Sequence, residues 1–334
     1  MRRITFIYVL VLPVLFLTAC AGTPQSREAG RTLEVGVLGA ETEREGFRLL
    51  ASAGSGTGEE NELCFGSGST PAAAMETLAG SGEQVVSAAH VEHLLMTETA
   101  AALLPELLDY AFRDPLLSTE TQLWVVEGED LEPLFREDPA GRMEVLKTAG
   151  GNRQGFCPVT IREAAGAVAM GEPVLLPTLD PETLERTGAV LYDGKEFVSR
   201  FDLDEALGAS LLSGEKIHWT ASAGEDAMSL RLARCDLEPV WESGKLKGLS
   251  VRCILNGVPV GGGSARAGAL EEQTIHQVRA ALEKLKQSGG GRLLLGRAGL
   301  KDPLRWRKLA EQWGKDFPAL DAEVRVTVRR EDGV

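Results

Sequence analysis

The residues with the clearest chemical potential lie at the start of the chain. Arg2 and Arg3 precede the apolar segment 4–17, and Leu17-Thr18-Ala19-Cys20 closes it. A basic start, an apolar stretch and a small residue before a cysteine are typical of a bacterial lipoprotein signal. The sulfur of such a cysteine receives a diacylglyceryl group, and cleavage makes it the first mature residue. The sequence therefore predicts lipidation of Cys20, with an ordinary cleaved signal and a chance cysteine as the alternative.

The apolar segment favours an anchor made of lipid over one made of protein. A helix needs roughly 20 apolar residues to span a bilayer, whereas the segment 4–17 is shorter and contains Pro13. Each buried methylene of an acyl chain contributes about 0.8 kcal/mol to membrane binding, so two or more chains hold a protein at the surface. Residues 21–31 are polar and rich in small residues, which predicts a flexible tether over 20–31 after a signal peptide over 1–19.

Four further cysteines are spread along the chain, and two of them fall in strand-like runs. Cys235 lies in SLRLARCDLEPV and Cys253 in GLSVRCILNG, with a turn expected around 242–245. A hairpin there brings the two sulfurs close together across neighbouring strands. Directly opposed positions are often poor for disulfide geometry, so a disulfide and a pair of buried thiols both stay open. The redox state of Cys64 and Cys157 is open too, and without a C-x-x-C motif a zinc ribbon is unsupported.

The remaining polar motifs give little support to catalysis or metal binding. His90 and His93 would share one face of a helix, but their apolar neighbours favour a strand, on which they point to opposite sides. His218 and His276 are isolated. The glycine-rich loops lack the G-K-[ST] ending of a phosphate-binding loop, and no G-x-S-x-G motif occurs. We therefore expect no catalytic residue, no metal site and no cofactor, and the sequence assigns no ligand-binding residue.

The charge balance excludes a nucleic-acid-binding role. The chain has a formal net charge of −14, and loss of Arg2 and Arg3 with the signal peptide lowers it to about −16. An acidic body repels nucleic acid and anionic lipid headgroups. Contact with a membrane is therefore expected to come from the lipid and from docked proteins, and not from a basic patch.

The spacing of apolar residues predicts strands and helices in both halves of the chain. Strand-like runs around 33–37 and 91–96 precede an amphipathic helix over 97–112. The proline-rich segment 171–181 separates this half from a hairpin over 188–198. Further helices are expected over 71–79, 160–170, 202–213 and 268–287, and a half-buried strand over 322–328.

A last helix is expected after Asp302-Pro303, with an apolar side made by Leu304, Trp306, Leu309 and Trp313. Core packing of this side on a sheet is favoured over a ligand platform. The elements together predict an α+β protein of two, or three, domains, each a mixed or antiparallel sheet covered by helices. The domains are placed at 32–180 and 186–332.

The C-terminal third of the chain resembles a known family. The long helix is followed by DPLRWRKL over 302–309, a W-x-x-x-F-P step over 313–318 and an alternating Val/Arg strand over 322–330. This order is similar to the end of the C-subunit lipoproteins of spore germinant receptors, the GerAC-like or Ger(x)C family. The hairpin and leucine-rich helix over 188–212 resemble the start of the same C-terminal domain.

The first half carries the resemblance further. The run AAHVEHLLMTE over 88–98 is similar to a glycine-histidine strand of the family, and LDYAFRDP over 108–115 to its L-D-x-x-x-R-D-P segment. The predicted lipidation of Cys20 agrees as well. The resemblance spans most of the chain in the same order, which makes it more specific than any single motif.

The resemblance implies a non-catalytic subunit with GerAC-like N- and C-terminal domains. Such proteins sit lipid-anchored on the outer face of the spore inner membrane, where two integral membrane subunits complete a nutrient receptor. The alternative is a solute-binding lipoprotein of an uptake system, which requires two similar parallel-sheet lobes around a ligand cleft. A lipid-anchored hydrolase requires a nucleophile or a metal constellation that the sequence does not supply.

Overall fold

The structure is a computed structural model of the whole chain. The predicted signal peptide 1–19, the tether 20–31 with Cys20, and Cys157 all lie outside these residues. Among the described residues, no helix has the length and apolarity needed to cross a membrane. The described ranges are 32–44, 46–53, 62–81, 85–137, 139–145, 158–194, 196–223, 226–260 and 266–331.

The first half of the chain builds a mixed sheet in the order β11-β10-β9-β7-β6-β2-β3-β4, with β8 paired to β7. Its centre is parallel, because β6 pairs in parallel with β2 and β7, and β7 with β9. Both sides of the sheet are antiparallel. A separate parallel pair joins β1 and β5. The strands are β1 (Thr32–Glu34), β2 (Val37–Glu43), β3 (Gly46–Ala53), β4 (Glu62–Gly68), β5 (Val85–Ser87), β6 (His93–Thr97), β7 (Gln122–Val126), β8 (Val159–Thr160), β9 (Val174–Leu179), β10 (Arg186–Tyr192) and β11 (Phe197–Asp202).

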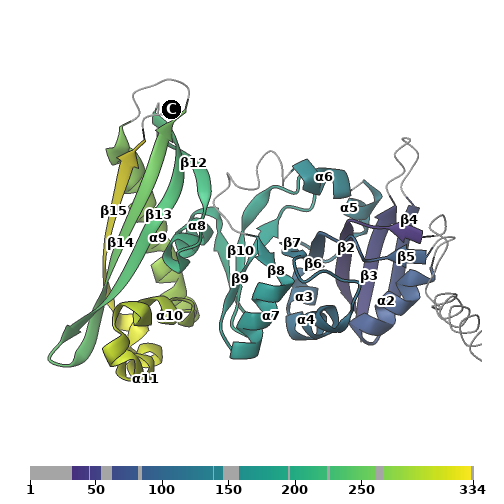
Figure 1. Cartoon of the computed structure of the whole chain (residues 1–334), viewed down its shortest axis with the longest axis horizontal. Helices are drawn as coiled ribbons and strands as arrows, with labels where there is room; N and C mark the ends of the chain where they lie inside the picture. Colours follow the sequence, from purple (N-terminus) through teal and green to yellow (C-terminus); the bar gives the residue numbers. More distant parts are fainter. Residues whose placement is uncertain are drawn as a thin grey trace, which may run out of the picture.

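Helices cover both faces of this sheet (Figure 1). Successive residues of β7 point to opposite faces, so Leu123 and Val125 enter one apolar cluster while Trp124 and Val126 enter another. Strands buried on both faces read as continuous apolar runs, as Leu123–Val126 does. The first cluster includes residues of α2, α4 and α7, and the second includes residues of α5 and α6. The helices are α2 (Pro71–Ala79), α3 (Glu98–Ala101), α4 (Leu104–Arg113), α5 (Glu132–Arg136), α6 (Pro139–Val145) and α7 (Ile161–Met170).

The second half builds a four-stranded sheet in the order β12-β13-β14-β15. Its first three strands are antiparallel, and β15 pairs in parallel with β14. Val324, Val326 and Val328 of β15 are buried while the residues between them are more exposed, as their alternation predicts. The strands are β12 (His218–Ala223), β13 (Asp226–Glu242), β14 (Lys245–Pro259) and β15 (Asp321–Arg330), and the helical segments are α8 (Leu203–Ser213), α9 (Ala267–Ser288), α10 (Arg292–Lys301), η3 (Pro303–Arg305), α11 (Trp306–Asp316) and η4 (Phe317–Ala319).

Helix α8 joins the two halves. Asp202 caps it, because its side chain accepts a hydrogen bond from the backbone N of Glu205 and the Glu205 carboxylate accepts one from the N of Asp202. The helix is buried from Ala206 to Leu212. It contacts β10 of the large sheet and α9 of the small one. One apolar cluster therefore runs from Leu191 of β10 through α8 into the C-terminal sheet.

The predicted α+β fold class is confirmed, with one mixed sheet and one mainly antiparallel sheet, both covered by helices. The expected hairpin over 188–198 forms as β10 and β11, but it extends the large sheet. The domain boundary expected between 180 and 186 thus falls between β9 and β10, which are paired in one sheet. The single helix expected over 97–112 is two helices, α3 and α4. Pro105 accounts for the break, since it has no N–H to donate within a continuous helix.

Candidate functional site

The two cysteines in the long hairpin stand directly opposite each other. β13 and β14 turn at Ser243–Gly244, and the register pairs Cys235 with Cys253. Both side chains are buried free thiols, and the Cys253 Sγ donates to the Cys235 Sγ at 3.1 Å. This hydrogen bond, together with burial, raises the pKa of the Cys253 thiol. A protonated, inaccessible thiol is a poor nucleophile, so the pair has the character of a packed core contact.

Charged groups next to this pair attach α10 to the hairpin. Arg297 donates a 2.8 Å hydrogen bond to the carbonyl oxygen of Cys235. The Asp236 carboxylate lies 2.6 Å from both Lys301 Nζ and Arg234 Nε. Burial alone would raise the pKa of Asp236, but the hydrogen bonds from Lys301 and Arg234 outweigh it and lower that pKa. These contacts serve to hold the helix on the sheet.

His90 and His93 line the same surface hollow, of about 390 Å³, but their side chains differ in environment. His90 is exposed, with Nε2 3.6 Å from Glu34. His93 is buried, and its Nδ1 accepts a 3.2 Å hydrogen bond from Trp124 Nε1. Among the residues that the structure describes, no group of three or more histidine, cysteine or acidic side chains is placed to hold a metal ion.

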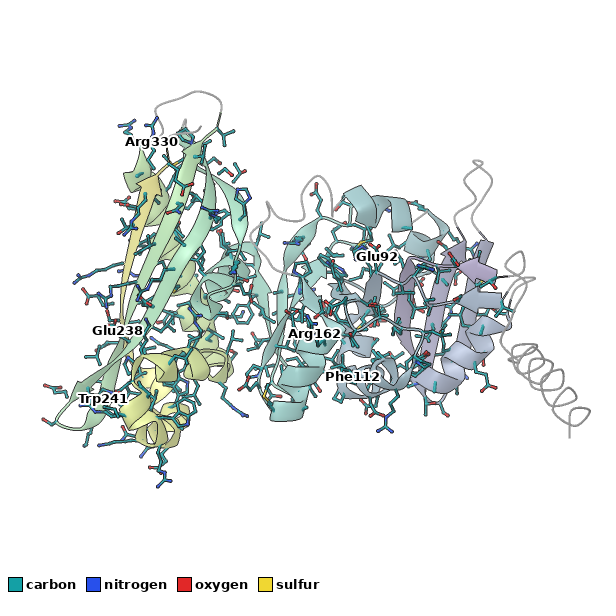
Figure 2. The ribbon with its side chains drawn as sticks, viewed as in Figure 1. Glu92, Phe112, Arg162, Glu238, Trp241 and Arg330 are labelled. Atoms are coloured by element: carbon teal, nitrogen blue, oxygen red, sulfur yellow. The ribbon has the colours of Figure 1, made fainter. Side chains whose placement is uncertain are left out.

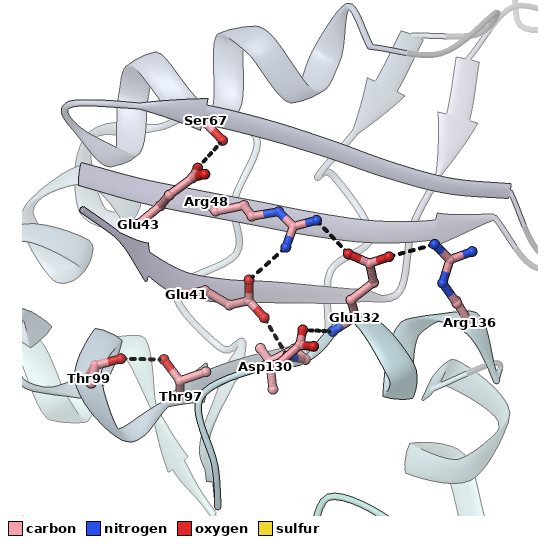
Figure 3. Close-up of polar contacts among 10 residues, drawn as sticks. Glu41, Glu43, Arg48, Ser67, Thr97, Thr99, Asp130, Glu132 and Arg136 are labelled. Carbon is pink, nitrogen blue, oxygen red and sulfur yellow. Dashed lines mark hydrogen bonds and ion pairs between the residues drawn. The ribbon is translucent and has the colours of Figure 1, made fainter. Parts of the chain in front are cut away.

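A polar cluster lies on the face of the large sheet that α5 covers (Figure 3). It is not among the features predicted from the sequence. Glu41 of β2 and Arg48 of β3 are cross-strand partners, with a 3.3 Å ion pair. Arg48 also contacts Glu132 of α5 at 2.8 Å, and Glu132 in turn contacts Arg136 at 2.5 Å. The backbone N of Leu131 donates to Glu41. The cluster therefore fastens α5 to two neighbouring strands.

The surroundings of Glu41 and Glu132 shift the pKa values of their carboxylates in opposite directions. Burial raises the pKa of Glu41. The hydrogen bond from the Leu131 N–H and the charge of Arg48 act in the opposite direction, but burial has the larger effect. Hydrogen bonds from Arg48 and then Arg136 lower the pKa of Glu132, which is near the surface. Glu41 and Glu132 are far apart in sequence, and both contact Arg48 only because α5 lies over this part of the sheet. No local sequence pattern could have revealed it.

A groove of about 440 Å³ lies where α8 and α9 meet β12. Gln277 Nε2 donates to Asp204 Oδ1 at 2.6 Å, and Arg186 and Trp219 also contribute to the lining. The Oε1 atom of Gln273 is buried and has no hydrogen-bond partner within the described residues. The groove thus combines a cation, two carboxylates and two amides, which are groups that bind polar molecules. The predicted thiol pair, Cys235 and Cys253, does not line this groove.

Comparison with known proteins rests on the fold. No protein-family model matches the sequence, and no curated protein matches it. The chain is similar in structure to one described as the crystal structure of the GerBC protein, with a TM-score of 0.53. The likeness covers 88% of this chain and 97% of that chain, at 14% sequence identity. The two proteins therefore share a fold over nearly their whole lengths.

Proposed function

We propose that this chain is the non-catalytic C-subunit of a spore germinant receptor. The observation that carries the proposal is the shared fold with GerBC, which extends over 88% of this chain and 97% of that one. Runs that resemble segments of the GerAC-like family follow one another in the family's order, from 88–98 to 322–330. The fold and these sequence similarities both support the same class of protein.

The proposed subunit is attached to the membrane through lipid on Cys20, with residues 20–31 as the tether. The lipid keeps the folded body close to the integral membrane subunits of the receptor. Confinement of this kind raises the local concentration of the partners, so weak docking contacts are sufficient for assembly. The role of the subunit is then to dock on those partners and stabilise the assembled receptor in spore germination.

The architecture supports this proposal over a solute-binding lipoprotein. That alternative requires two similar parallel-sheet lobes around a cleft. The large sheet has a parallel centre between antiparallel sides, whereas the small sheet is a long antiparallel hairpin with one parallel partner. The two halves are thus dissimilar. The charged clusters around Glu41 and Asp236 also serve packing, which agrees with a non-catalytic role.

The anchor is tested by Cys20→Ala, followed by fractionation and mass spectrometry. The unsubstituted protein is expected in the membrane fraction with a diacylglyceryl mass on its first residue, and the variant in the soluble fraction without it. Cys64→Ala is the matched control, since it removes a cysteine that lies in the folded body. Recovery of Cys20→Ala protein in the membrane fraction to the same extent would contradict the anchoring proposal.

The receptor role is tested in spores. Deletion of the gene is expected to slow germination in response to one class of nutrient, and affinity purification in mild detergent is expected to recover two integral membrane proteins with this chain. Neighbouring genes that encode a multi-span transporter-like protein and a membrane protein with a large soluble domain would agree with that result. Unchanged germination with every nutrient in a strain without related genes, or co-purification of a permease and an ATPase, would count against it.

A further inference from the structure

Exposed apolar side chains gather at one end of the C-terminal half, where α10, η3, α11 and the tip of the β13–β14 hairpin meet. Leu304 is 98% exposed, Leu300 75% and Trp306 44%. Single exposed apolar residues are ordinary, but several together with neighbouring cations are typical of an interaction surface. We call this surface the tip patch, and it consists of Leu300, Leu304, Arg305, Trp306, Arg307 and Lys308.

The tip patch differs from the packing that the sequence predicts for the last helix. Only Leu309 and Trp313 of the expected apolar side are buried. The chain passes through the short helix η3 before α11 begins, and every residue from Pro303 to Lys308 is exposed. The Trp306 ring lies close to Gly299 of α10, where a Cβ would be 2.2 Å from it, and the residue stays partly open to solvent.

The tip patch rests on a rigid support. Trp241, near the tip of the hairpin, donates a 2.8 Å hydrogen bond from Nε1 to Asp302. The Arg305 guanidinium and the Lys308 ammonium lie over the Trp241 ring, 5.5 and 5.6 Å from its centroid. Figure 2 shows Trp241 at the end of the long hairpin, with Arg330 at the opposite end. The exposed residues are therefore presented by a fixed turn.

The charge of this end is opposite to that of the whole protein. The segment 292–316 carries seven basic and three acidic residues, in a chain with a formal net charge of −14. Arg292 and Arg297 precede the patch, and Arg305, Arg307 and Lys308 lie within it. An acidic protein approaches an anionic surface only through a region where positive charge is concentrated. The tip patch provides that region together with apolar side chains, which departs from the expectation, drawn from the net charge alone, that no basic patch contacts a membrane.

We propose that the tip patch docks on the surface of a bilayer that contains anionic phospholipid. Leu300, Leu304 and the exposed edge of Trp306 enter the boundary between headgroups and acyl chains, where tryptophan is enriched in membrane proteins. Arg305, Arg307 and Lys308 pair with the headgroup phosphates, and cations near such a surface add to the binding. This combination of apolar side chains and cations matches an anionic bilayer better than a purely polar protein surface.

The position of the tip patch makes it a second attachment point. Strand β1, the first described element after the tether, pairs with β5, and Figure 1 shows β5 and α11 at opposite ends of the long axis. A lipid on Cys20 and the tip patch would therefore hold the body at both ends, lying along the membrane. Docking of the patch needs only an anionic surface, so it does not rest on the receptor role.

The test uses the mature polypeptide from residue 20 with Cys20→Ser, so that no lipid contributes. We expect it to sediment with phosphatidylglycerol–phosphatidylcholine vesicles, to sediment poorly with pure phosphatidylcholine vesicles, and to dissociate as salt is raised. Leu304→Asp combined with Arg305→Glu and Arg307→Glu is expected to reduce partitioning about tenfold or more. These side chains are exposed, but Arg305 also contacts Trp241 and Asp302, so circular dichroism checks that the variant is folded.

The matched control places the same kinds of substitution at the other end of the hairpin. Val260→Asp and Arg329→Glu alter an exposed apolar residue and an exposed cation away from the patch, and they are expected to leave partitioning unchanged. A milder pair, Arg305→Gln with Arg307→Gln, is expected to weaken binding and its salt dependence while keeping Leu304. Absence of binding to the anionic vesicles, equal losses in patch and control variants, or binding of the patch to an acidic protein but not to vesicles would each overturn the proposal.

Discussion

The Cys253 Sγ lies 3.1 Å from the Cys235 Sγ, at directly paired positions of β13 and β14. Both thiols are buried in the apolar cluster of the C-terminal half, and Arg297 of α10 donates to the carbonyl of Cys235. The pair therefore lies where the long hairpin meets a helix. Its accessibility and ionisation report on the packing of this region.

We predict that both thiols stay reduced and do not react with a thiol reagent while the protein is folded. Burial excludes the reagent, and the raised pKa of Cys253 keeps that group protonated. Alkylation in denaturant without reductant, followed by peptide mass spectrometry, is expected to label both cysteines. A disulfide-linked peptide containing Cys235 and Cys253 would contradict the prediction.

The same pair predicts a loss of stability in alkali. The folded-state pKa of Cys253 is raised above the ordinary value of about 9, so its contribution is present below pH 9 and is lost as the pH rises further. The free energy of unfolding is expected to fall less steeply above pH 9 in Cys253→Ala, with a difference of up to about 1.4 kcal/mol per pH unit. Urea denaturation at several pH values measures the two slopes, and equal slopes would exclude the effect.

Asp236 is predicted to stabilise the contact between β13 and α10 at neutral pH. Asp236→Asn removes the charge that Lys301 and Arg234 contact at 2.6 Å, and we expect a loss of about 2 kcal/mol in the free energy of unfolding at pH 7. Because the folded-state pKa of Asp236 is lowered, this stabilisation is present above the ordinary pKa of about 4 and is lost as the pH falls through the folded-state value. The difference between the two proteins should therefore shrink below pH 4.

The control for that experiment is Asp109→Asn. Asp109 forms a 2.8 Å ion pair with Arg113 on the exposed surface of α4. Exposed pairs contribute about 0.5 kcal/mol or less, so little change is expected. A similar loss in both variants would indicate a general effect of reduced charge.

The cluster around Arg48 predicts strong coupling between two substitutions. Arg48→Met leaves the buried Glu41 without its cation, and we expect a loss of about 2 kcal/mol in the free energy of unfolding. Glu41→Gln in the same chain removes the unpaired charge, so the double variant should lose less than the sum of the single losses. A double-mutant cycle from urea denaturation measures this coupling. Simple additivity would mean that the ion pair contributes little.

Local sequence patterns predicted the individual strands and helices of this fold better than they predicted how those elements are arranged. The alternating Val324, Val326 and Val328 predicted β15, and the run of polar residues after Trp241 predicted the turn that pairs the cysteines. Both depend only on neighbours in sequence. The attachment of β10 and β11 to the large sheet depends on pairing between β9 and β10, and the proline-rich segment before it suggested a boundary instead.

The polar cluster and the tip patch were beyond sequence reasoning for different reasons. Glu41 and Glu132 share Arg48 as a partner only because α5 lies over this part of the sheet. Leu304 and Trp306 fit the apolar spacing of a helix that continues to Trp313, and the spacing therefore assigned them to the core. The chain enters α11 through a separate turn, so helical periodicity did not apply across it. A net positive segment in an acidic chain was the available sign of an exposed surface.

Helix α8, which joins the two halves, packs closely against α9. A Cβ at Gly208 of α8 would lie 2.2 Å from the carbonyl oxygen of Gln277 in α9, whereas a Cβ at Gly296 of α10 would meet nothing within 4 Å. Gly208→Ala is expected to force α8 and α9 apart and to cost about 2–3 kcal/mol in the free energy of unfolding. Gly296→Ala, the same change at an exposed position of α10, should stabilise the protein by about 0.5–1 kcal/mol, because alanine favours a helix more than glycine does. Urea denaturation compares the two variants, and a Gly208→Ala protein as stable as the unsubstituted one would show that the close approach of α8 and α9 is not required for packing.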